Sequence, residues 1–398
     1  MLSDKLKIAA VVGARPNFMK IAPLARELAK YPERFEFVLI HTGQHYDNLM
    51  NEVFFSELGI PAPDIHLGVG SGSQAQQTAR IMLEFEKAMV EIAPHVVIVL
   101  GDVNSTIAAA LVAAKLGIAV AHVEAGLRSR DRRMPEEINR VLTDALSDVL
   151  YTPSRLADRN LISEGVPPAK ISLVGNIMID SLIGFLERAG QRKIVREMEL
   201  TPQGYGLVTL HRPANVDDRE ILSGIVEALV EISGRLPLVF PVHPRTAKML
   251  SSFGLDTRLE QTGRIRMIEP VGYLDILCLM QSTRLVISDS GGIQEESSFL
   301  RIPCITIREN TERPETILEG TNTLAGNDRE LIVRLAADAV DGRGKRGGDL
   351  EFWDGAVAAR IVKDLEKRRA WLMSSPDERV DQAAIQVDNC HPENGNNQ

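Results

Sequence analysis

Aromatic residues and cysteines are scarce in this chain, and their scarcity disfavours two kinds of protein. Phe, Trp and Tyr together make up 5% of the 398 residues, too few to suggest a stacking platform for single-stranded nucleic acid. The three cysteines are scattered and lack the spacing of a metal site. We therefore expect no bound metal, and we interpret Cys278 and Cys304 as buried apolar residues of a reduced, cytoplasmic protein.

The chain also lacks an excess of positive charge and any long apolar run. Its formal net charge of −9 at pH 7 argues against nucleic acid or an anionic membrane as the main partner. No apolar run approaches the ~20 residues that span a bilayer, and the polar start of the chain predicts no signal peptide. With 44% hydrophobic and 25% charged residues, the composition is typical of a soluble globular protein long enough for two domains.

Short β-branched runs alternate with helical patterns throughout, which predicts an α/β fold with parallel sheets wound on both faces. The predicted strands of the first half are residues 7–12, 37–40, 96–100, 119–123, 149–151 and 171–174. Those of the second half are residues 207–210, 238–242, 264–268, 285–288 and 304–307. The predicted helices include residues 17–30 (kinked at Pro23), 136–147 and 176–186, and one that carries Leu49, Val53 and Leu58 and ends at Gly59 and Pro61.

These elements divide into two Rossmann-like domains. We place the N-terminal domain at residues 1–174 and the C-terminal domain at residues 175–355, with a charged connection after residue 186. A closing helix at residues 356–373 is expected to pack back on the first domain. The polar residues 374–398 are expected to be disordered.

Two small-residue turns lie about one Rossmann domain apart, at residues 11–16 and 288–296. Each follows a short apolar run and opens onto a helical pattern, so that backbone N–H groups and the positive helix end can bind an anion. Two such ends facing each other across a cleft would hold a diphosphate with two organic ends, which points to a nucleotide-sugar. Neither turn has the glycine spacing of a nicotinamide site or a Walker lysine, which weakens a dehydrogenase or ATPase interpretation.

Polar side chains that follow predicted strands are candidates for chemistry, because ligands of open α/β sheets bind beyond the carboxyl ends of the strands. Asp102 and Glu124 follow two strands of the first half. Taken singly, each acid is better explained as a helix cap or a loop charge. Two acids at strand ends of one half-sheet shift the balance towards acid–base chemistry. Glu136 begins a helix, where a favourable helix-dipole charge explains it about as well as catalysis does.

The candidate cations and donors have similar alternatives. Arg15 sits in a glycine turn beside a helix start, where phosphate binding is favoured over simple capping, whereas Lys20 is equally well a solvated helix residue. For His211, at a strand end beside Arg212, a functional role is favoured over a role in packing. The same preference is weaker for His243.

Six motifs, in order, resemble the non-hydrolysing UDP-N-acetylglucosamine (UDP-GlcNAc) 2-epimerase family. They are Gly13-Ala14-Arg15-Pro16 with Lys20, Gly101-Asp102, the run from His122 to Arg128, Pro135-Glu136-Glu137-Ile138-Asn139-Arg140, the run from Ser290 to Glu296, and Thr311-Glu312-Arg313-Pro314-Glu315. The resemblance covers residues 7–372. It implies a GT-B-like pair of Rossmann domains with the active site in the interdomain cleft, and a homodimer. It also implies interconversion of UDP-GlcNAc and UDP-ManNAc without a redox cofactor or a required metal.

The resemblance also assigns roles to individual residues. It implies that the catalytic residues are Asp102, Glu124, Glu136 and His211. It implies substrate contacts near the diphosphate from Arg15 and Lys20, phosphate contacts from Ser290, Gly291 and Gly292, a ribose contact from Glu296, and a cleft arginine at Arg313. Arg140, His243 and Ile276 complete the predicted substrate-binding set.

The chain departs from the family pattern in three places. Pro213-Ala214-Asn215 replaces a longer polar run, Tyr46-Asp47 stands where substrate-activated enzymes carry an arginine, and Pro244-Arg245 differs from the pattern those enzymes share. We therefore expect weak or absent allosteric activation by UDP-GlcNAc.

Other activities stay open on the same residues. One alternative is a 2-epimerase of a UDP-2,3-diacetamido-uronic acid, and another is a hydrolysing epimerase that releases UDP and free ManNAc. A GT-B glycosyltransferase or a non-catalytic nucleotide-sugar sensor would share the fold without chemistry at C2. The intact motif at residues 311–315 favours plain GlcNAc, and the acids in the N-terminal half disfavour the glycosyltransferase.

Overall fold

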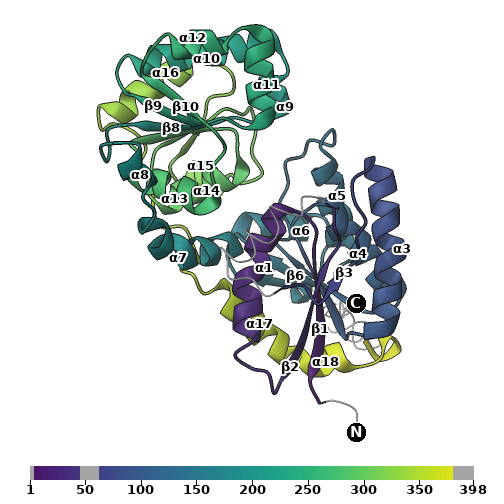
Figure 1. The fold of residues 1–398 in the computed structure, drawn as a ribbon. Helices are drawn as coiled ribbons and strands as arrows, with labels where there is room; N and C mark the ends of the chain where they lie inside the picture. Colours follow the sequence, from purple (N-terminus) through teal and green to yellow (C-terminus); the bar gives the residue numbers. More distant parts are fainter. Residues whose placement is uncertain (1–3, 45–61, 380–398) are drawn as a thin grey trace, which may run out of the picture. The chain divides into compact units, whose positions relative to one another are not determined.

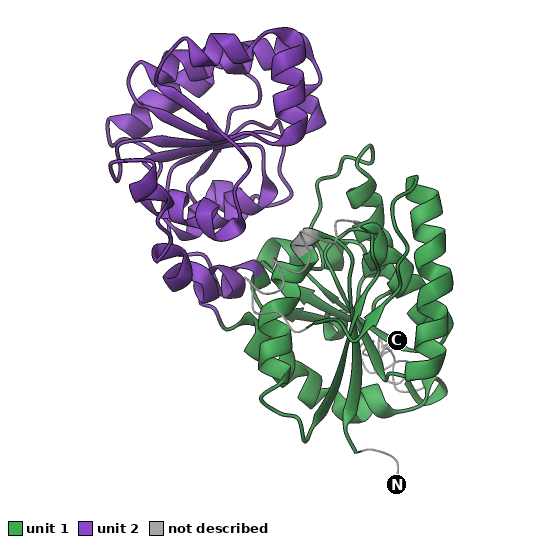
Figure 2. Cartoon of the chain, viewed as in Figure 1, with its two compact units in different colours: residues 1–177, 356–398 green, residues 178–355 purple. Residues whose placement is uncertain are grey.

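The computed structural model describes residues 4–44 and 62–379, and these form two compact units (Figures 1 and 2). Unit 1 comprises residues 1–177 and 356–398, and unit 2 comprises residues 178–355. The chain therefore passes into unit 2 three residues later than the sequence boundary of 174/175 and leaves it at residue 355. The helix predicted to carry Leu49, Val53 and Leu58 lies outside the described residues.

Unit 1 contains a seven-stranded parallel sheet with the strand order β3-β2-β1-β4-β5-β6-β7. Its strands are β1 (Leu6–Val12), β2 (Phe35–His41), β3 (Ile65–His66), β4 (Val96–Leu100), β5 (Ala119–Val123), β6 (Val149–Thr152) and β7 (Ile171–Leu173). The order reverses between β1 and β4, and such a switch point is where doubly wound sheets bind ligands.

Helices cover both faces of this sheet, because its central strands are apolar on both sides. They are α1 (Arg15–Leu28), α3 (Gln74–Ile92), α4 (Asn104–Lys115), α5 (Pro135–Leu146), α6 (Arg155–Ser163), α17 (Val357–Lys367) and α18 (Arg369–Met373), with a 3-10 turn at Pro168–Lys170. Ala9 and Val11 of β1 pack with Phe85 of α3 and Ala110 of α4 on one face. Figure 1 shows α1 and α17 together on the other.

Unit 2 contains a six-stranded parallel sheet with the order β10-β9-β8-β11-β12-β13. Its strands are β8 (Gly206–Thr209), β9 (Leu238–Pro241), β10 (Ile265–Ile268), β11 (Leu285–Ser288), β12 (Cys304–Thr306) and β13 (Asn322–Leu324). Its helices are α7 (Ile177–Gly190), α8 (Ile194–Glu197), α9 (Pro213–Val216), α10 (Arg219–Ser233), α11 (Pro244–Phe253), α12 (Asp256–Glu260), α13 (Tyr273–Ser282), α14 (Gly291–Phe299), α15 (Glu315–Leu318) and α16 (Arg329–Val340). Two doubly wound parallel sheets confirm the predicted fold class.

The last described segment returns to unit 1. The single helix expected at residues 356–373 is two helices, α17 and α18, separated at Arg368. Buried residues of α17 include Ile361 and Leu365, and the helix packs against α1. Of the tail expected to be disordered, residues 374–379 are described: residues 376–379 are helical, and Arg379 donates a 2.7 Å hydrogen bond to the Ser374 carbonyl.

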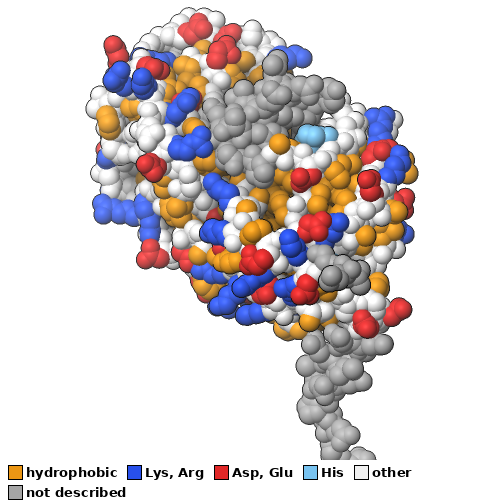
Figure 3. Space-filling model, turned by 60° about the horizontal axis from the view of Figure 1, so that its bottom comes forward, with side chains coloured by type: hydrophobic (Ala, Val, Ile, Leu, Met, Phe, Trp, Pro, Cys, Tyr) orange, Lys and Arg blue, Asp and Glu red, His pale blue; other side chains and the backbone are white. Residues whose placement is uncertain are grey.

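Other features of the described residues bear on the sequence predictions. Pro23 lies inside α1, which continues as one helix through it. Cys278 and Cys304 are both buried free thiols, as predicted. None of the helices in the described ranges is long and apolar enough to cross a membrane. On the face of the molecule in Figure 3, acidic and basic side chains are interspersed among apolar ones.

Candidate active site

The switch point of unit 1 is tightly packed at the turn after β1. Gly13 leaves no room for a side chain, because an added Cβ would lie 2.0 Å from Ser105 Oγ. Asn17, in the first turn of α1, donates a 2.8 Å hydrogen bond to the Leu100 carbonyl at the end of β4. Arg15 is the first residue of α1, and its side chain lies outside the described part of the structure. The turn therefore brings the N-terminus of α1 to the end of β4.

A buried ion pair joins Lys20 of α1 to Glu124, the residue after β5. Their side chains are 8% and 5% exposed, and Lys20 Nζ donates to Glu124 Oε2. Gly101 lies against both groups, since a Cβ there would be 2.8 Å from Lys20 Nζ and 3.3 Å from Glu124 Oε2. Of the two interpretations open to Lys20, the solvated helix residue is excluded. Glu124 has a φ of +73°, an uncommon conformation for a residue other than glycine.

Asp102 is held by helix α5 through both its backbone and its side chain. Arg140 donates to the Asp102 carboxylate, and Asn139 Nδ2 donates a 2.9 Å hydrogen bond to the Asp102 carbonyl. Arg140 also pairs with Glu137 at 2.8 Å. Burial by itself raises the pKa of Glu137, but hydrogen bonds from the backbone of Ser129 and Arg130, with the charge of Arg140, hold that pKa below its ordinary value.

Glu136 occupies the first turn of α5, directly after Pro135, and its side chain is exposed. The structure therefore brings Asp102, Glu124, Lys20 and Arg140 together in unit 1, and it places Glu136 on the same helix as Arg140. A helix-dipole role for Glu136 stays as open as a catalytic one.

At the switch point of unit 2, His211 follows β8 and pairs with Asp289, which follows β11. His211 Nδ1 lies 2.9 Å from Asp289 Oδ1, and the imidazole is 42% exposed while the carboxylate is fully buried. Asp289 also accepts from the backbone N–H of His211 and Arg212 and from Asn215 Nδ2. Burial raises the pKa of Asp289, but these hydrogen bonds, led by the one from His211, hold it below the ordinary range. The buried carboxylate thus orients an accessible imidazole.

Beside it, Ser290 and Gly291-Gly292 form the N-terminus of α14. Ser290 occupies the N-cap position of the helix, whose first backbone N–H groups have no partner within the helix. An added Cβ on Gly291 would lie 3.0 Å from Arg313 Nη1, whereas one on Gly292 would meet nothing within 4 Å. Arg313 forms ion pairs of 2.5 Å with Glu295 and with Glu312. This arrangement suits an anion at the helix N-terminus.

Glu296 lies one turn into α14 and accepts a 3.0 Å hydrogen bond from the Tyr273 hydroxyl. Burial raises the pKa of Glu296 to about 7, and the charge of Glu295 adds to the rise. The sequence analysis did not predict Tyr273 as a site residue. Its position directly after the glycine at the N-cap of α13 is the feature that could have suggested it.

Two further predicted substrate contacts, His243 and Ile276, have structural roles of their own. His243 caps α11, accepting a 3.2 Å hydrogen bond from the Arg245 N–H through Nδ1, and its ring centroid lies 5.8 Å from that of His211. Burial and the neighbouring His211 lower the pKa of His243. Ile276 of α13 is half-buried and packs against an apolar cluster that includes Leu279.

Comparison with known proteins now identifies the family. A model of the family UDP-N-acetylglucosamine 2-epimerase matches residues 26–366. The chain belongs to this family. It is 46% identical to a UDP-N-acetylglucosamine 2-epimerase of Methanococcus maripaludis, over 89% of this chain and 97% of the relative. The resemblance drawn from the six motifs is thereby confirmed, and the protein is an enzyme of the epimerase kind.

A solved structure and a second relative complete the comparison. The Methanocaldococcus jannaschii UDP-GlcNAc 2-epimerase, in complex with UDP-GlcNAc and UDP, matches this chain with a TM-score of 0.81 at 43% identity, covering 91% of this chain and 99% of that one. A Pseudomonas aeruginosa UDP-2,3-diacetamido-2,3-dideoxy-D-glucuronate 2-epimerase is also 43% identical, over 91% of this chain and all of the relative. Within the described residues, no group of three His, Cys, Asp or Glu side chains is placed to hold a metal ion.

Proposed function

We propose that this epimerase interconverts UDP-GlcNAc and UDP-ManNAc by eliminating UDP to a 2-acetamidoglucal and adding it back. The observation that carries the proposal is the pair of carboxylates at the carboxyl ends of two central strands in unit 1. Asp102 and Glu124 follow neighbouring strands, and each is held by a cation from a helix. Two acids in differing electrostatic surroundings are what a base and an acid working on one carbon need.

The chemistry requires more than a base. The hydrogen on C2 of the sugar is not next to a carbonyl, so direct deprotonation is very costly. Breaking the bond between C1 and the diphosphate oxygen first puts positive charge on C1 and makes the C2 proton acidic. Loss of that proton leaves the C1=C2 double bond of the glycal and free UDP. Re-addition of UDP at C1, with protonation of C2 from the other face, gives the epimer.

In this proposal unit 1 moves the C2 proton and unit 2 holds most of UDP. Asp102, Glu124 and Glu136 supply base and acid, and Lys20 holds the Glu124 carboxylate in place. The leaving diphosphate is stabilised by Arg15, His211 and the backbone N–H groups at Ser290 to Gly292. Glu296 accepts hydrogen bonds from the ribose hydroxyls.

A diacetamido-uronate is the second candidate substrate, because the relative named for it is 43% identical to this chain, the same value as for the M. jannaschii enzyme. The intact motif at residues 311–315 favours the neutral GlcNAc. Arg313 pairs with Glu295 and Glu312, and Arg308 also pairs with Glu312, so the two cations of this cluster are matched by two carboxylates. Weak or absent activation by UDP-GlcNAc and a cytoplasmic location stay predictions from the sequence.

The test is proton NMR of UDP-GlcNAc incubated with the protein in D2O. The proposal expects deuterium at C2 together with a UDP-ManNAc signal. Accumulation of UDP and free ManNAc would show a hydrolysing epimerase instead. If neither exchange nor product appears, the proposal fails for GlcNAc, and exchange at C2 of the UDP-diacetamido-uronate would establish the second candidate.

Binding of UDP is expected to weaken as pH falls through about 7, the pKa of Glu296. Ribose hydroxyls donate to the ionised carboxylate. Protonation below this pKa turns one of its oxygens into a donor and removes the charge that strengthens these hydrogen bonds. At pH 6 about a tenth of the carboxylate is ionised, and affinity should be up to about tenfold lower than at pH 8. Titration calorimetry with UDP measures this. Glu296→Gln is the control, because the UDP phosphate still titrates when this variant is used. Equal pH dependence in both proteins would contradict the assignment of the effect to Glu296.

We also propose that the protein is a homodimer that associates through α3 and α5, which both pack against α4. Each of the two helices carries two large apolar side chains that are unusually exposed: Leu83 at 61% and Val90 at 70% on α3, and Ile138 at 47% and Leu142 at 49% on α5. Apolar groups gathered on one helical layer favour a protein partner, and we take this partner to be a second copy of the chain.

Replacing Leu142 with arginine is therefore expected to convert the dimer into a monomer, because a charge would enter the buried centre of the interface. Light scattering coupled to gel filtration measures the mass. Leu318→Arg is the matched control, since Leu318 is 75% exposed but belongs to α15 of unit 2. A dimer that survives Leu142→Arg, or a wild-type monomer, would overturn this interface.

A further inference from the structure

The two loops that carry Asp102 and Glu124 have unusual backbone conformations. Gly101, Glu124 and Gly126 have φ values of +64°, +73° and +79°. At Glu124 this left-handed conformation is strained, because its side chain crowds the following carbonyl. Such a conformation persists only where surrounding contacts hold it.

One buried side chain, Asp144 of α5, contacts both loops. Its Oδ2 accepts a 3.1 Å hydrogen bond from the Gly126 N–H, two residues after Glu124. Its Oδ1 lies 2.7 Å from His122 Nδ1, and His122 Nε2 lies 2.8 Å from the Gly101 carbonyl, one residue before Asp102. The Asp144 and His122 side chains are 2% and 0% exposed, so no water replaces these contacts.

The hydrogen-bond geometry makes the His122 ring a bridge between Asp144 and the Asp102 loop. One ring nitrogen faces the Asp144 carboxylate and the other faces the Gly101 carbonyl. Replacing Asp144 removes the partner of this ring and the acceptor of the Gly126 N–H, so that both loops lose a contact.

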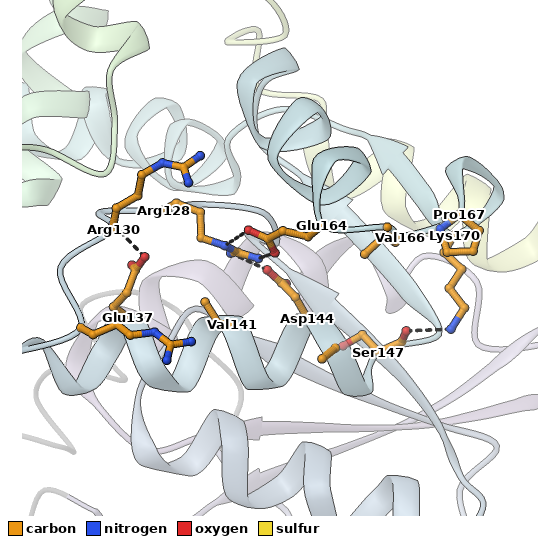
Figure 4. Close-up of a pocket in the computed structure, with 13 residues that line it drawn as sticks. Arg128, Arg130, Glu137, Val141, Asp144, Ser147, Glu164, Val166, Pro167 and Lys170 are labelled. Atoms are coloured by element: carbon orange, nitrogen blue, oxygen red, sulfur yellow. Dashed lines mark hydrogen bonds and ion pairs between the residues drawn. The ribbon is translucent and has the colours of Figure 1, made fainter.

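Arg128 and Glu164 fix the other side of the Asp144 carboxylate. Arg128 Nη1 lies 2.7 Å from Asp144 Oδ2, and Arg128 forms two hydrogen bonds with Glu164, of 2.9 and 2.6 Å. Figure 4 shows Asp144 and Glu164 both directed at Arg128, beside a cavity of about 730 Å³. Burial raises the pKa of Asp144, but His122 and Arg128 hold it below the ordinary value. Asp144 is therefore an anchored anion.

We propose that Asp144 is the positioning residue that fixes the Asp102 loop and the Glu124 loop relative to one another, acting on the first loop through His122. The proposal rests on the proposed function, since it takes these two carboxylates to be the groups that act on C2. Asp144 itself does not contact the substrate. Misplacement of a catalytic group by about 1 Å can cost about a hundredfold in rate.

Asp144→Asn is expected to lower kcat by about tenfold to a hundredfold while KM and UDP affinity stay near the wild-type values. Asp148→Asn is the matched control. Asp148 also accepts a hydrogen bond from β5, at the Val120 N–H (3.0 Å), but at the far end of the strand from Glu124. If Asp148→Asn lowers kcat equally, or if Asp144→Asn changes KM and melting temperature but not kcat, the residue is merely structural and the proposal fails.

A double-mutant cycle tests the route through His122. If Asp144 holds the Asp102 loop by way of the ring, adding His122→Gln to Asp144→Asn should lower kcat no further than the larger single effect. Additive losses would show that the two residues act separately and would overturn the relay.

Amide hydrogen exchange separates this proposal from the proposed function. Asp144→Asn should increase exchange at Gly101 and at residues 124–126, and Asp148→Asn should not. This readout needs no substrate. An inactive wild type that shows the exchange change would refute the epimerase assignment and retain the positioning role, whereas unchanged exchange would refute the positioning role whatever the activity.

Discussion

Replacing Glu124 with glutamine is expected to reduce kcat for UDP-GlcNAc epimerisation by about 10³-fold and to leave UDP affinity near that of the unmodified protein. A positioned general acid or base contributes about 10²–10⁴-fold to a rate, and glutamine can neither take nor give the C2 proton. UDP affinity is preserved because Glu124 is not among the proposed UDP contacts, most of which belong to unit 2. Initial rates by coupled UDP-sugar assay and calorimetry with UDP measure the two quantities.

Glutamine is the appropriate replacement because Glu124 pairs with a buried lysine. A side chain without an acceptor would leave Lys20 buried and uncompensated, which costs about 3–5 kcal/mol, whereas glutamine still accepts a hydrogen bond. Glu36→Gln is the control, since Glu36 also pairs with a lysine, at 3.1 Å, but on the surface. If Glu124→Gln abolishes UDP binding together with turnover, its role is structural. If turnover persists, Glu124 is not the base or the acid.

Replacing Gly292 with valine is expected to raise the Kd for UDP at least about 100-fold, or about 2.7 kcal/mol, without lowering the melting temperature. A Cβ at Gly292 meets no protein atom within 4 Å, so the fold has room for a side chain. The same space is where we place the diphosphate, because a glycine at a helix N-terminus lets backbone N–H groups approach phosphate oxygens. A side chain at position 292 therefore clashes with the ligand but not with the surrounding protein.

Gly224→Val gives the matched comparison for this substitution. Gly224 also lies in a helix, α10 of unit 2, and a Cβ there also meets nothing within 4 Å. It should leave UDP binding unchanged. Normal UDP binding by Gly292→Val would remove this turn from the proposed site, and an equal loss of binding in Gly224→Val would show that the effect is not local.

The sequence predicts the central strands well because they are buried on both faces. The bounds of β4, β5 and β11 agree with the predicted runs, since a short apolar run between two helical patterns is typical of a strand that helices cover on both sides. The edge strands β3 and β13 were missed. They have two and three residues, and each includes a polar one, so neither forms a recognisable apolar run.

The strand-end rule found Asp102, Glu124, His211 and Ser290, but it could not predict which side chains they pair with. Lys20 and Glu124 are 104 positions apart, and His211 and Asp289 are 78 apart. Such pairs depend on the register between strands. Leu100 of β4 is aligned with Val123 of β5, and this alignment alone puts Gly101 level with Glu124. Register in parallel sheets is set by packing over both faces, which local sequence does not encode.

Unit 1 is assembled from both ends of the chain, and this affects how the protein is made. A ribosome releases residues in order, so the continuous unit 2 is complete before α17 and α18 have been synthesised. Until then, the apolar surface of α1 that α17 covers stays open on a nascent chain. A premature stop after residue 355 would therefore yield a finished unit 2 attached to an incomplete and aggregation-prone unit 1.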